Sequence, residues 1–324
     1  MSRCLSAHDV VSGRSAGHAT VFLIDGIGDQ FFVLPAMRAL AGIFPGRLQL
    51  VIGEGMLTFM YRELGLGEAV RVRYDDHERN DAGPVAAALK PSDLLLCLST
   101  RCYPFAVELA RRIGATRTMG YHDCFDEYWP IRADRHLFEH HFAIAQHFDP
   151  TRCFEDHARP PVLSSAARAA AARSMREFRG TAARVLFVHP ESAIAAKTWP
   201  LERLRWVLER FVEVHPEYAV VVHNLEPLAL DPHGGRVRQS SCDHLERTMA
   251  MIPHADLFLG VDSCCLHAAD LCRVPGVGLF GPSKVAKAGF RLSPVHRHVA
   301  GASMDAITRE SVLDALLDVA DRVR

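Results

Sequence analysis

Side chains suited to acid–base or phosphate chemistry recur at three places, each in the segment that follows a short apolar run. Asp29 follows a Gly-Ile-Gly turn, Lys197 lies in a loop of small residues, and Asp262 begins an Asp-Ser pair. A carboxylate can act as a general base, and an ammonium group can neutralise phosphate. These residue types indicate either acid–base catalysis or the binding of a phosphorylated ligand.

Asp29 has two interpretations on spacing alone. The glycines at 26 and 28 let the backbone turn sharply and let a large group approach the N-terminus of the next helix. The third glycine position of the dinucleotide fingerprint holds Phe31, so the segment is not that motif. Asp29 is then either a residue that takes part in the chemistry at this turn or simply the cap of the helix.

Lys197 and Asp262 also have a functional and a structural interpretation. Lys197 precedes Pro200, which opens a helix where its missing N–H costs nothing. At the carboxyl edge of a parallel sheet Lys197 could neutralise phosphate, and otherwise it is a solvated lysine. Asp262 and Ser263 combine a helix cap with an anion cradle, and His267 is either a ligand contact or a satisfied helix histidine.

The chain alternates strand-type and helix-type segments, which is the pattern that would bring these side chains to sheet edges. Strands are predicted at residues 20–25, 48–52, 93–98, 185–189, 219–223, 257–261 and 277–280. Helices are predicted between them, among others at residues 104–113, 201–215, 264–272 and 305–323. This alternation predicts parallel sheets covered by helices on both faces.

A length of 324 residues predicts about two domains. The Arg-Pro-Pro segment at residues 159–161 is typical of a stiff linker, and the Ala-rich residues 164–178 predict a surface helix. We therefore expect two facing, doubly wound domains at residues 1–160 and 161–324, with ligand at the carboxyl ends of the strands. The last helix packs back on the first domain or closes the second.

Composition excludes several classes of protein. The chain is 49% apolar and 23% charged, with 37 basic against 38 acidic residues and a net charge of −1. No global cationic field exists to hold nucleic acid or an anionic membrane. The apolar runs are far shorter than the ~20 residues of a spanning helix, and the N-terminus lacks the apolar region of a secretory signal. We expect a cytoplasmic protein.

The chain has eighteen histidines and nine cysteines, which could suggest a metal site, but the spacing of these residues does not support one. No Cys-x-x-Cys pair occurs, so reduced thiols are expected. His136 and His140 belong to an HxxEH sequence and would share a helix face, but a zinc site needs a third ligand. The three cysteines of one predicted helix are taken as core thiols, namely Cys264, Cys265 and Cys272. We predict no metal and no cofactor.

Taken together, these segments resemble the ADP-heptose-dependent heptosyltransferases of glycosyltransferase family 9, which have the two-domain GT-B architecture. Residues 28–40 match the family's G-D-x5-P-A-L-R-A-L opening, residues 197–200 its K-x-W-P segment, residues 260–269 its G-V-D-[ST] segment with a following histidine, and residues 280–283 its F-G-P-[ST] turn. Their order and spacing fit from about residue 20 to residue 290.

The resemblance implies an inverting sugar transfer that needs no metal. Asp29 would be the general base on the acceptor hydroxyl, Lys197 would neutralise the departing diphosphate, and Asp262 would orient the donor sugar. The donor contacts that it implies or favours are Gly28, Ser192, Glu226, Ser263, Cys264 and His267. Arg101 is a candidate contact to the acceptor, and Arg62 and Lys90 are two further cations that could meet an anionic acceptor.

Four positions depart from the family pattern. Cys264 replaces a glycine, Leu266 replaces the usual serine before the histidine, Asp25 stands where Arg or Ser is usual, and Lys284 replaces an acidic residue. The first departure places a side chain where the family backbone approaches the donor.

The donor implied by the resemblance is ADP-heptose, and the implied acceptor is the inner core of lipopolysaccharide. That acceptor would be reached from the cytoplasmic face of the inner membrane, with at most peripheral contact. Transfer to protein or to a secondary metabolite remains open. So do a non-catalytic nucleotide-sugar binder or scaffold, and a nucleotide-sugar epimerase.

Overall fold

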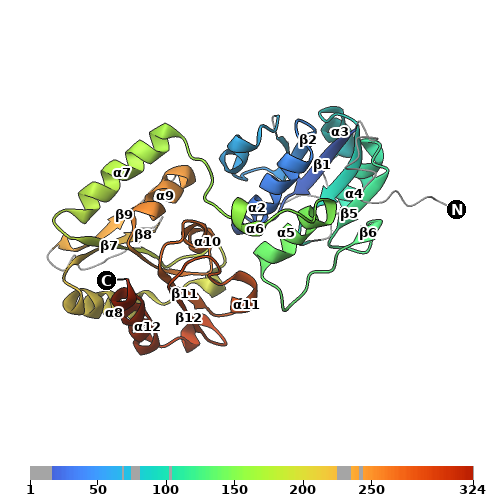
Figure 1. Ribbon diagram of the computed structural model, residues 1–324. Helices are drawn as coiled ribbons and strands as arrows, with labels where there is room; N and C mark the ends of the chain where they lie inside the picture. Colours follow the sequence, from blue (N-terminus) through green and yellow to red (C-terminus); the bar gives the residue numbers. More distant parts are fainter. Residues whose placement is uncertain are drawn as a thin grey trace. The chain divides into compact units, whose positions relative to one another are not determined.

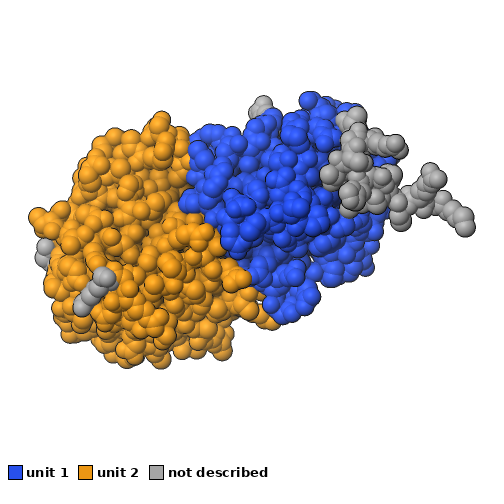
Figure 2. Space-filling view, in the orientation of Figure 1, with its two compact units in different colours: residues 1–162 blue, residues 163–324 orange. Residues whose placement is uncertain are grey.

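The computed structural model describes residues 17–67, 69–73, 81–101, 104–224, 235–240 and 244–323. The chain divides into two compact units, residues 1–162 and residues 163–324 (Figure 2). Each unit contains one six-stranded sheet flanked by helices (Figure 1).

Unit 1 is built on a parallel sheet in the order β3-β2-β1-β4-β5-β6. Its strands are β1 (His18–Leu23), β2 (Leu48–Gly53), β3 (Val70–Val72), β4 (Ser92–Cys97), β5 (Arg117–Gly120) and β6 (Glu127–Tyr128). Its helices are α2 (Ile27–Ile43), the 3-10 helix η1 (Thr58–Leu64), α3 (Ala82–Ala87), α4 (Pro104–Arg112), α5 (Leu137–Phe148) and α6 (Phe154–His157).

Unit 2 is built on a second parallel sheet in the order β12-β11-β10-β7-β8-β9. Its strands are β7 (Arg184–His189), β8 (Tyr218–His223), β9 (Val237–Ser240), β10 (Leu257–Val261), β11 (Gly276–Phe280) and β12 (His296–Ala300). Its helices are α7 (Ser165–Arg179), α8 (Leu201–Val214), α9 (Leu245–Met251), α10 (Cys264–Leu271), α11 (Val285–Ala288) and α12 (Arg309–Arg322), with 3-10 turns η2 (Ala195–Lys197), η4 (Ile252–His254) and η5 (Met304–Ala306).

The two sheets have the same topology, although the sequence shows no repeat. Counted from the first strand of each unit, both follow the doubly wound order 3-2-1-4-5-6. The strand order reverses between β1 and β4 in unit 1 and between β7 and β10 in unit 2. Open parallel sheets bind ligands at such switch points, beyond the carboxyl ends of the strands. The fold therefore directs attention to the loops after β1, β4, β7 and β10.

The central strands are apolar on both faces because helices cover both faces of each sheet. In unit 2 a large cluster includes Trp199, Phe211 and Tyr218 with residues of α12 such as Leu316. Helix α12 packs on α8, β11 and β12 (Figure 1), so the end of the described chain lies within unit 2. Among the described residues, no helix is both long and apolar enough to cross a membrane.

All seven predicted strands are present within two residues of their predicted bounds. The final helix begins at Arg309 rather than at 305, because residues 304–306 form η5 and Thr308 caps the helix by accepting from Ser311 N–H at 3.2 Å. The strands that the sequence did not predict are mostly short edge strands: β3, β5, β6, β9 and β12. The reason is visible in β12, whose polar, half-exposed residues lack a buried-strand pattern.

Candidate functional site

Three side chains predicted from two separate motifs meet at the switch point of unit 2. Lys197 Nζ donates to Asp262 Oδ2 at 2.6 Å, and His267 Nε2 lies 3.4 Å from Asp262 Oδ1. Lys197 belongs to the loop after β7, whereas Asp262 directly follows β10 and His267 lies one turn into α10. Lys197 is thus not a freely solvated lysine, and the cluster spans the two loops that the topology singles out.

Asp262 is held in its ionised form. Its side chain is only 6% exposed, and this burial alone would favour the neutral acid. The hydrogen bonds and charges of His267 and Lys197 outweigh that effect and hold the pKa of Asp262 well below its ordinary value. The Lys197 side chain is 23% exposed, and its ammonium group keeps further N–H donors for a ligand.

The loop that carries Lys197 is pinned to the core of unit 2 by Trp199. The indole is 2% exposed, its Nε1–H donates to Ile307 O at 3.3 Å, and its backbone N–H donates to Pro190 O at 3.4 Å. Within the loop, Ser192 Oγ accepts from Ile194 N–H at 3.3 Å. A buried anchor directly after a single turn of 3-10 helix fixes where the Lys197 side chain begins.

Helix α10 presents its N-terminus beside this cluster. Ser263 is the N-cap residue, but its side chain makes no capping hydrogen bond. Its Oγ is buried and has no hydrogen-bond partner among the described residues. The N–H groups of a first helical turn have no partner within the helix and favour anions. A hydroxyl and backbone donors are therefore available next to Lys197.

Cys264 lies at the first helical position, where it adds a half-buried side chain to this N-terminus. The hydrogen bond between the two thiols lowers the pKa of Cys264, whereas the same hydrogen bond, together with burial, raises the pKa of Cys265.

Two buried histidines at strand ends of unit 2 were not singled out from the sequence. His189 ends β7, and its Nδ1 lies 3.0 Å from the carbonyl oxygen of His223, which ends β8. His223 Nε2 lies 3.1 Å from Thr248 Oγ1. Burial lowers the pKa of both rings, that of His223 to about 4, so both are neutral at pH 7. Their positions as last residues of two strands are the signal that could have found them.

In unit 1 the switch point carries Asp29. Helix α2 begins at Ile27 with Gly26 as its N-cap, so Asp29 lies in the first turn and is not the N-cap residue. A Cβ on Gly26 would stand 3.4 Å from Asp29 Oδ2, which shows that the carboxylate turns back toward the start of the helix. The predicted donor contact Gly28 is within this first turn. The alternative of Asp29 as the N-cap is therefore wrong, although an acidic group in a first turn also favours the helix dipole.

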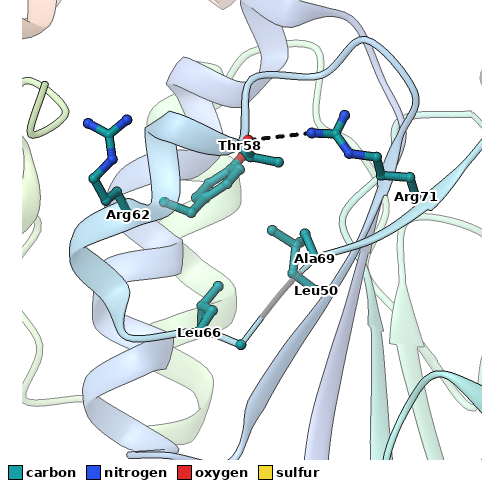
Figure 3. A pocket seen from close by; sticks show the side chains of 8 residues that line it. Leu50, Thr58, Arg62, Leu66, Ala69 and Arg71 are labelled. Atoms are coloured by element: carbon teal, nitrogen blue, oxygen red, sulfur yellow. Dashed lines mark hydrogen bonds between the residues drawn. The ribbon is translucent and has the colours of Figure 1, made fainter. Parts of the chain in front are cut away.

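The candidate acceptor cations lie at different edges of unit 1. Arg101 follows β4 and is exposed at the same sheet edge as Asp29. Lys90 precedes β4 and therefore lies at the opposite edge, which removes it from the neighbourhood of Asp29. Arg62 and Arg71 line a pocket of about 210 Å³ between η1 and the strands β2 and β3, where Arg71 Nη2 donates to Thr58 Oγ1 at 3.5 Å (Figure 3).

The remaining predictions concern one donor contact and metals. Glu226 lies outside the described residues. His136 is the N-cap of α5, where its Nδ1 accepts from Phe138 N–H at 3.2 Å, whereas His140 lies within the helix. Among the described residues, no group of three or more His, Cys, Asp or Glu side chains is arranged to hold a metal ion. The six described cysteines are free thiols.

The chain is similar to solved proteins in its structure. No protein-family model matches the chain, and no curated protein matches its sequence. A solved glycosyltransferase family 9 protein from Veillonella parvula has a TM-score of 0.71 and 17% identity, covering 95% of this chain and 98% of the other. The Escherichia coli ADP-heptose lipopolysaccharide heptosyltransferase II has a TM-score of 0.65 and 15% identity, covering 94% and 99%.

The similarity extends to a different class of enzyme at a lower level. The UDP-GlcNAc 2-epimerase of Methanocaldococcus jannaschii has a TM-score of 0.50 and 10% identity, covering 93% of each chain. The structural likeness to family 9 covers nearly the whole chain and agrees with the resemblance seen in the motifs. The prediction of fold is confirmed: the chain has the GT-B architecture of two Rossmann-like domains.

Proposed function

We propose that this protein is an inverting glycosyltransferase that transfers a heptose from ADP-heptose to an acceptor hydroxyl. The observation that carries the proposal is the cluster of Lys197, Asp262 and His267 at the switch point of unit 2, next to the unpartnered Ser263 hydroxyl. The solved heptosyltransferase that is similar in fold is described as acting with ADP-heptose, which supports the choice of donor.

The donor diphosphate would lie between Lys197 and the N-terminus of α10. Negative charge develops on the diphosphate as the sugar departs, and preorganised donors stabilise such charge most where water is scarce. Lys197 would supply a cation and Ser263 a hydroxyl, while Asp262 would orient the sugar through its remaining acceptor positions. His189 and His223, both neutral, would form the wall behind the donor. Because these groups meet the charge of the leaving group, the proposal needs no metal.

Unit 1 would supply the acceptor side. Asp29, at the switch point of the first sheet, would take the proton of the acceptor hydroxyl as it attacks the anomeric carbon on the face opposite the leaving diphosphate. Attack from that face inverts the configuration of the sugar. Arg101, exposed at the same edge, would meet an anionic acceptor such as the inner core of lipopolysaccharide at the cytoplasmic face of the inner membrane.

A nucleotide panel tests the donor assignment. Thermal unfolding of the protein with ADP, UDP, GDP and their sugar conjugates should show stabilisation by ADP and ADP-heptose above the others. Lys197→Ala should weaken ADP binding roughly 10- to 100-fold, since a hydrogen bond to a charged group contributes about 1.5–3 kcal/mol. Lys287→Ala, on the short helix α11, is the matched control and should bind as the wild type does. Preference for UDP compounds would overturn the ADP assignment.

An epimerase is the second candidate, favoured by the similarity of fold to a UDP-GlcNAc 2-epimerase. Nuclear magnetic resonance of the donor after incubation without acceptor separates the two functions. Without an acceptor, a transferase leaves the sugar of the donor unchanged, whereas an epimerase converts part of the donor into a second nucleotide sugar. Tight ADP binding without any turnover on offered acceptors would instead identify a non-catalytic binder.

A further inference from the structure

The two loops at the switch point of unit 1 are joined by a reciprocal pair of hydrogen bonds. The ladder between β1 and β4 ends where Leu98 N–H donates to Phe22 O at 2.9 Å. Beyond that point Ile24 N–H donates to Ser99 Oγ at 2.9 Å, and Thr100 N–H donates to Asp25 Oδ2. Side-chain oxygens thus continue the ladder after the backbones have diverged.

Burial makes these two bonds consequential. Asp25 is 2% exposed and Ser99 is 0% exposed, so water cannot readily replace either acceptor. A buried backbone N–H that loses its partner costs about 1–3 kcal/mol. The bond from Thr100 is also charge-assisted, because its acceptor is a carboxylate. Asp25 therefore fixes the course of the loop after β4.

The identity of residue 25 matters for the same reason. Arginine, one of the residues usual in the resembling family, has no acceptor atom and could not receive the Thr100 N–H. The departure at Asp25 supplies this chain with a carboxylate that spans the switch point. The pairing of Lys197 with Asp262 spans the corresponding point of unit 2.

The two loops joined by these hydrogen bonds carry residues that the proposed function uses. Asp29 lies four residues after Asp25, in the first turn of α2, and Arg101 directly follows Thr100. We propose that Asp25 is a positioning residue that holds the loop bearing Arg101 against the loop bearing Asp29, and so sets the affinity for the acceptor. This inference rests on the proposed function, because it assigns both loops to the acceptor.

Three variants test the proposal in the full-length protein: Asp25→Ala, Asp25→Asn and Asp93→Ala. Asp25→Ala removes the acceptor oxygen, whereas Asp25→Asn keeps one and loses only the charge. Asp93 is the matched control because its Oδ2 accepts from Gly17 N–H at 3.1 Å at the opposite edge of the same sheet. The readouts are amide hydrogen exchange of Thr100 and the KM values for ADP-heptose and for heptose-deficient lipopolysaccharide.

Asp25→Ala should speed exchange of the Thr100 amide about tenfold or more and raise the acceptor KM by a similar factor, with the donor KM unchanged within about twofold. Asp25→Asn should retain most of the protection and most of the acceptor affinity. Asp93→Ala should change neither Thr100 exchange nor the acceptor KM, even where it lowers stability.

Two results would overturn the inference. Unchanged Thr100 exchange in Asp25→Ala would show that the carboxylate does not hold the loop. Equal rises in both KM values would show a general structural effect in place of acceptor positioning. If Asp25→Ala fails to fold, Asp25→Leu replaces it, because leucine is close to aspartate in size and has no acceptor oxygen; unchanged Thr100 exchange in that variant contradicts the proposal. Absence of transfer by the wild type would overturn the proposed function and the acceptor role together. Exchange of the Thr100 amide would still report whether Asp25 holds the loop after β4.

Discussion

At the scale of single residues, Ser263 separates a ligand-binding role from a structural one. Its Oγ is buried beside the Lys197–Asp262 pair and has no hydrogen-bond partner among the described residues. Ser164, the N-cap of α7, does cap its helix, with its Oγ accepting from Ala167 N–H at 3.2 Å. Two serines at equivalent helix positions therefore differ in what they do for the fold.

Ser263→Ala should leave the melting temperature unchanged and weaken ADP binding roughly tenfold, because only the ligand uses this hydroxyl. Ser164→Ala should do the reverse and cost about 1 kcal/mol of stability without changing ADP binding. Calorimetric titration with ADP and thermal unfolding of both variants measure this. A Ser263→Ala protein that loses stability but binds ADP normally would contradict the assignment.

Asp262 links the site to the pH dependence of folding. Its pKa in the folded protein lies below the ordinary value of 3.8, so the folded state favours the ionised form more than the unfolded state does. The resulting stability is fully present above pH 3.8 and is lost as the pH falls toward the lower folded value. Asp262→Asn removes this dependence.

We expect the wild type to lose stability more steeply than Asp262→Asn when the pH is lowered from 5 toward 3. Urea unfolding at a series of pH values, followed for both proteins, measures the difference. Parallel curves for the two proteins over this interval would show that Lys197 and His267 do not hold Asp262 in its ionised form.

At the scale of elements, the loop between β7 and α8 depends on Trp199. Its indole donates to Ile307 O at 3.3 Å and packs in the core of unit 2, next to α12. The second tryptophan of this region, Trp206, is only partly buried and lies under the Arg309 guanidinium, 4.4 Å from the ring centroid. Trp206, within α8, therefore serves as a control for the loss of a tryptophan near the start of this helix.

Trp199→Phe should cost about 1 kcal/mol of unfolding free energy, because it deletes one buried hydrogen bond and leaves a ring in place. The same variant should weaken ADP binding severalfold, since the loop that carries Lys197 loses its anchor. Trp206→Phe should change ADP binding little. Denaturant unfolding and titration with ADP check both, and equal ADP affinity in wild type and Trp199→Phe would refute the role of the anchor.

The sequence predicted elements well where the chemistry is local. The buried central strand at residues 257–261 is a continuous apolar run, and β10 has the bounds predicted for it. Edge strands such as β12 carry polar, half-exposed residues and depend on their neighbours for pairing. Asp29 lies in the first turn of α2 and not at its N-cap, because Gly26 occupies that position, which the residue types alone do not determine.

At the scale of the whole molecule, two copies of one topology carry different chemistry. Both sheets follow the order 3-2-1-4-5-6, yet unit 1 has a carboxylate at its switch point and unit 2 has an ion pair. In unit 2 the side chains that the motifs predicted to be functional lie together, because strand ends at a sheet edge come together. The motifs did not predict the Asp25–Thr100 and Trp199–Ile307 contacts, since these join residues 75 and 108 positions apart.

In the proposed function the donor binds to unit 2 and the catalytic base belongs to unit 1, and one measurement tests this division most directly. Release of ADP from ADP-heptose, with heptose-deficient lipopolysaccharide as acceptor, is followed for the wild type and Asp29→Asn, together with the affinity of each for ADP. We predict that Asp29→Asn releases ADP roughly 10²–10⁴-fold more slowly than the wild type, as expected for loss of a general base, and that its affinity for ADP is unchanged. An Asp29→Asn protein that releases ADP at nearly the wild-type rate would contradict the assignment of Asp29 as the base.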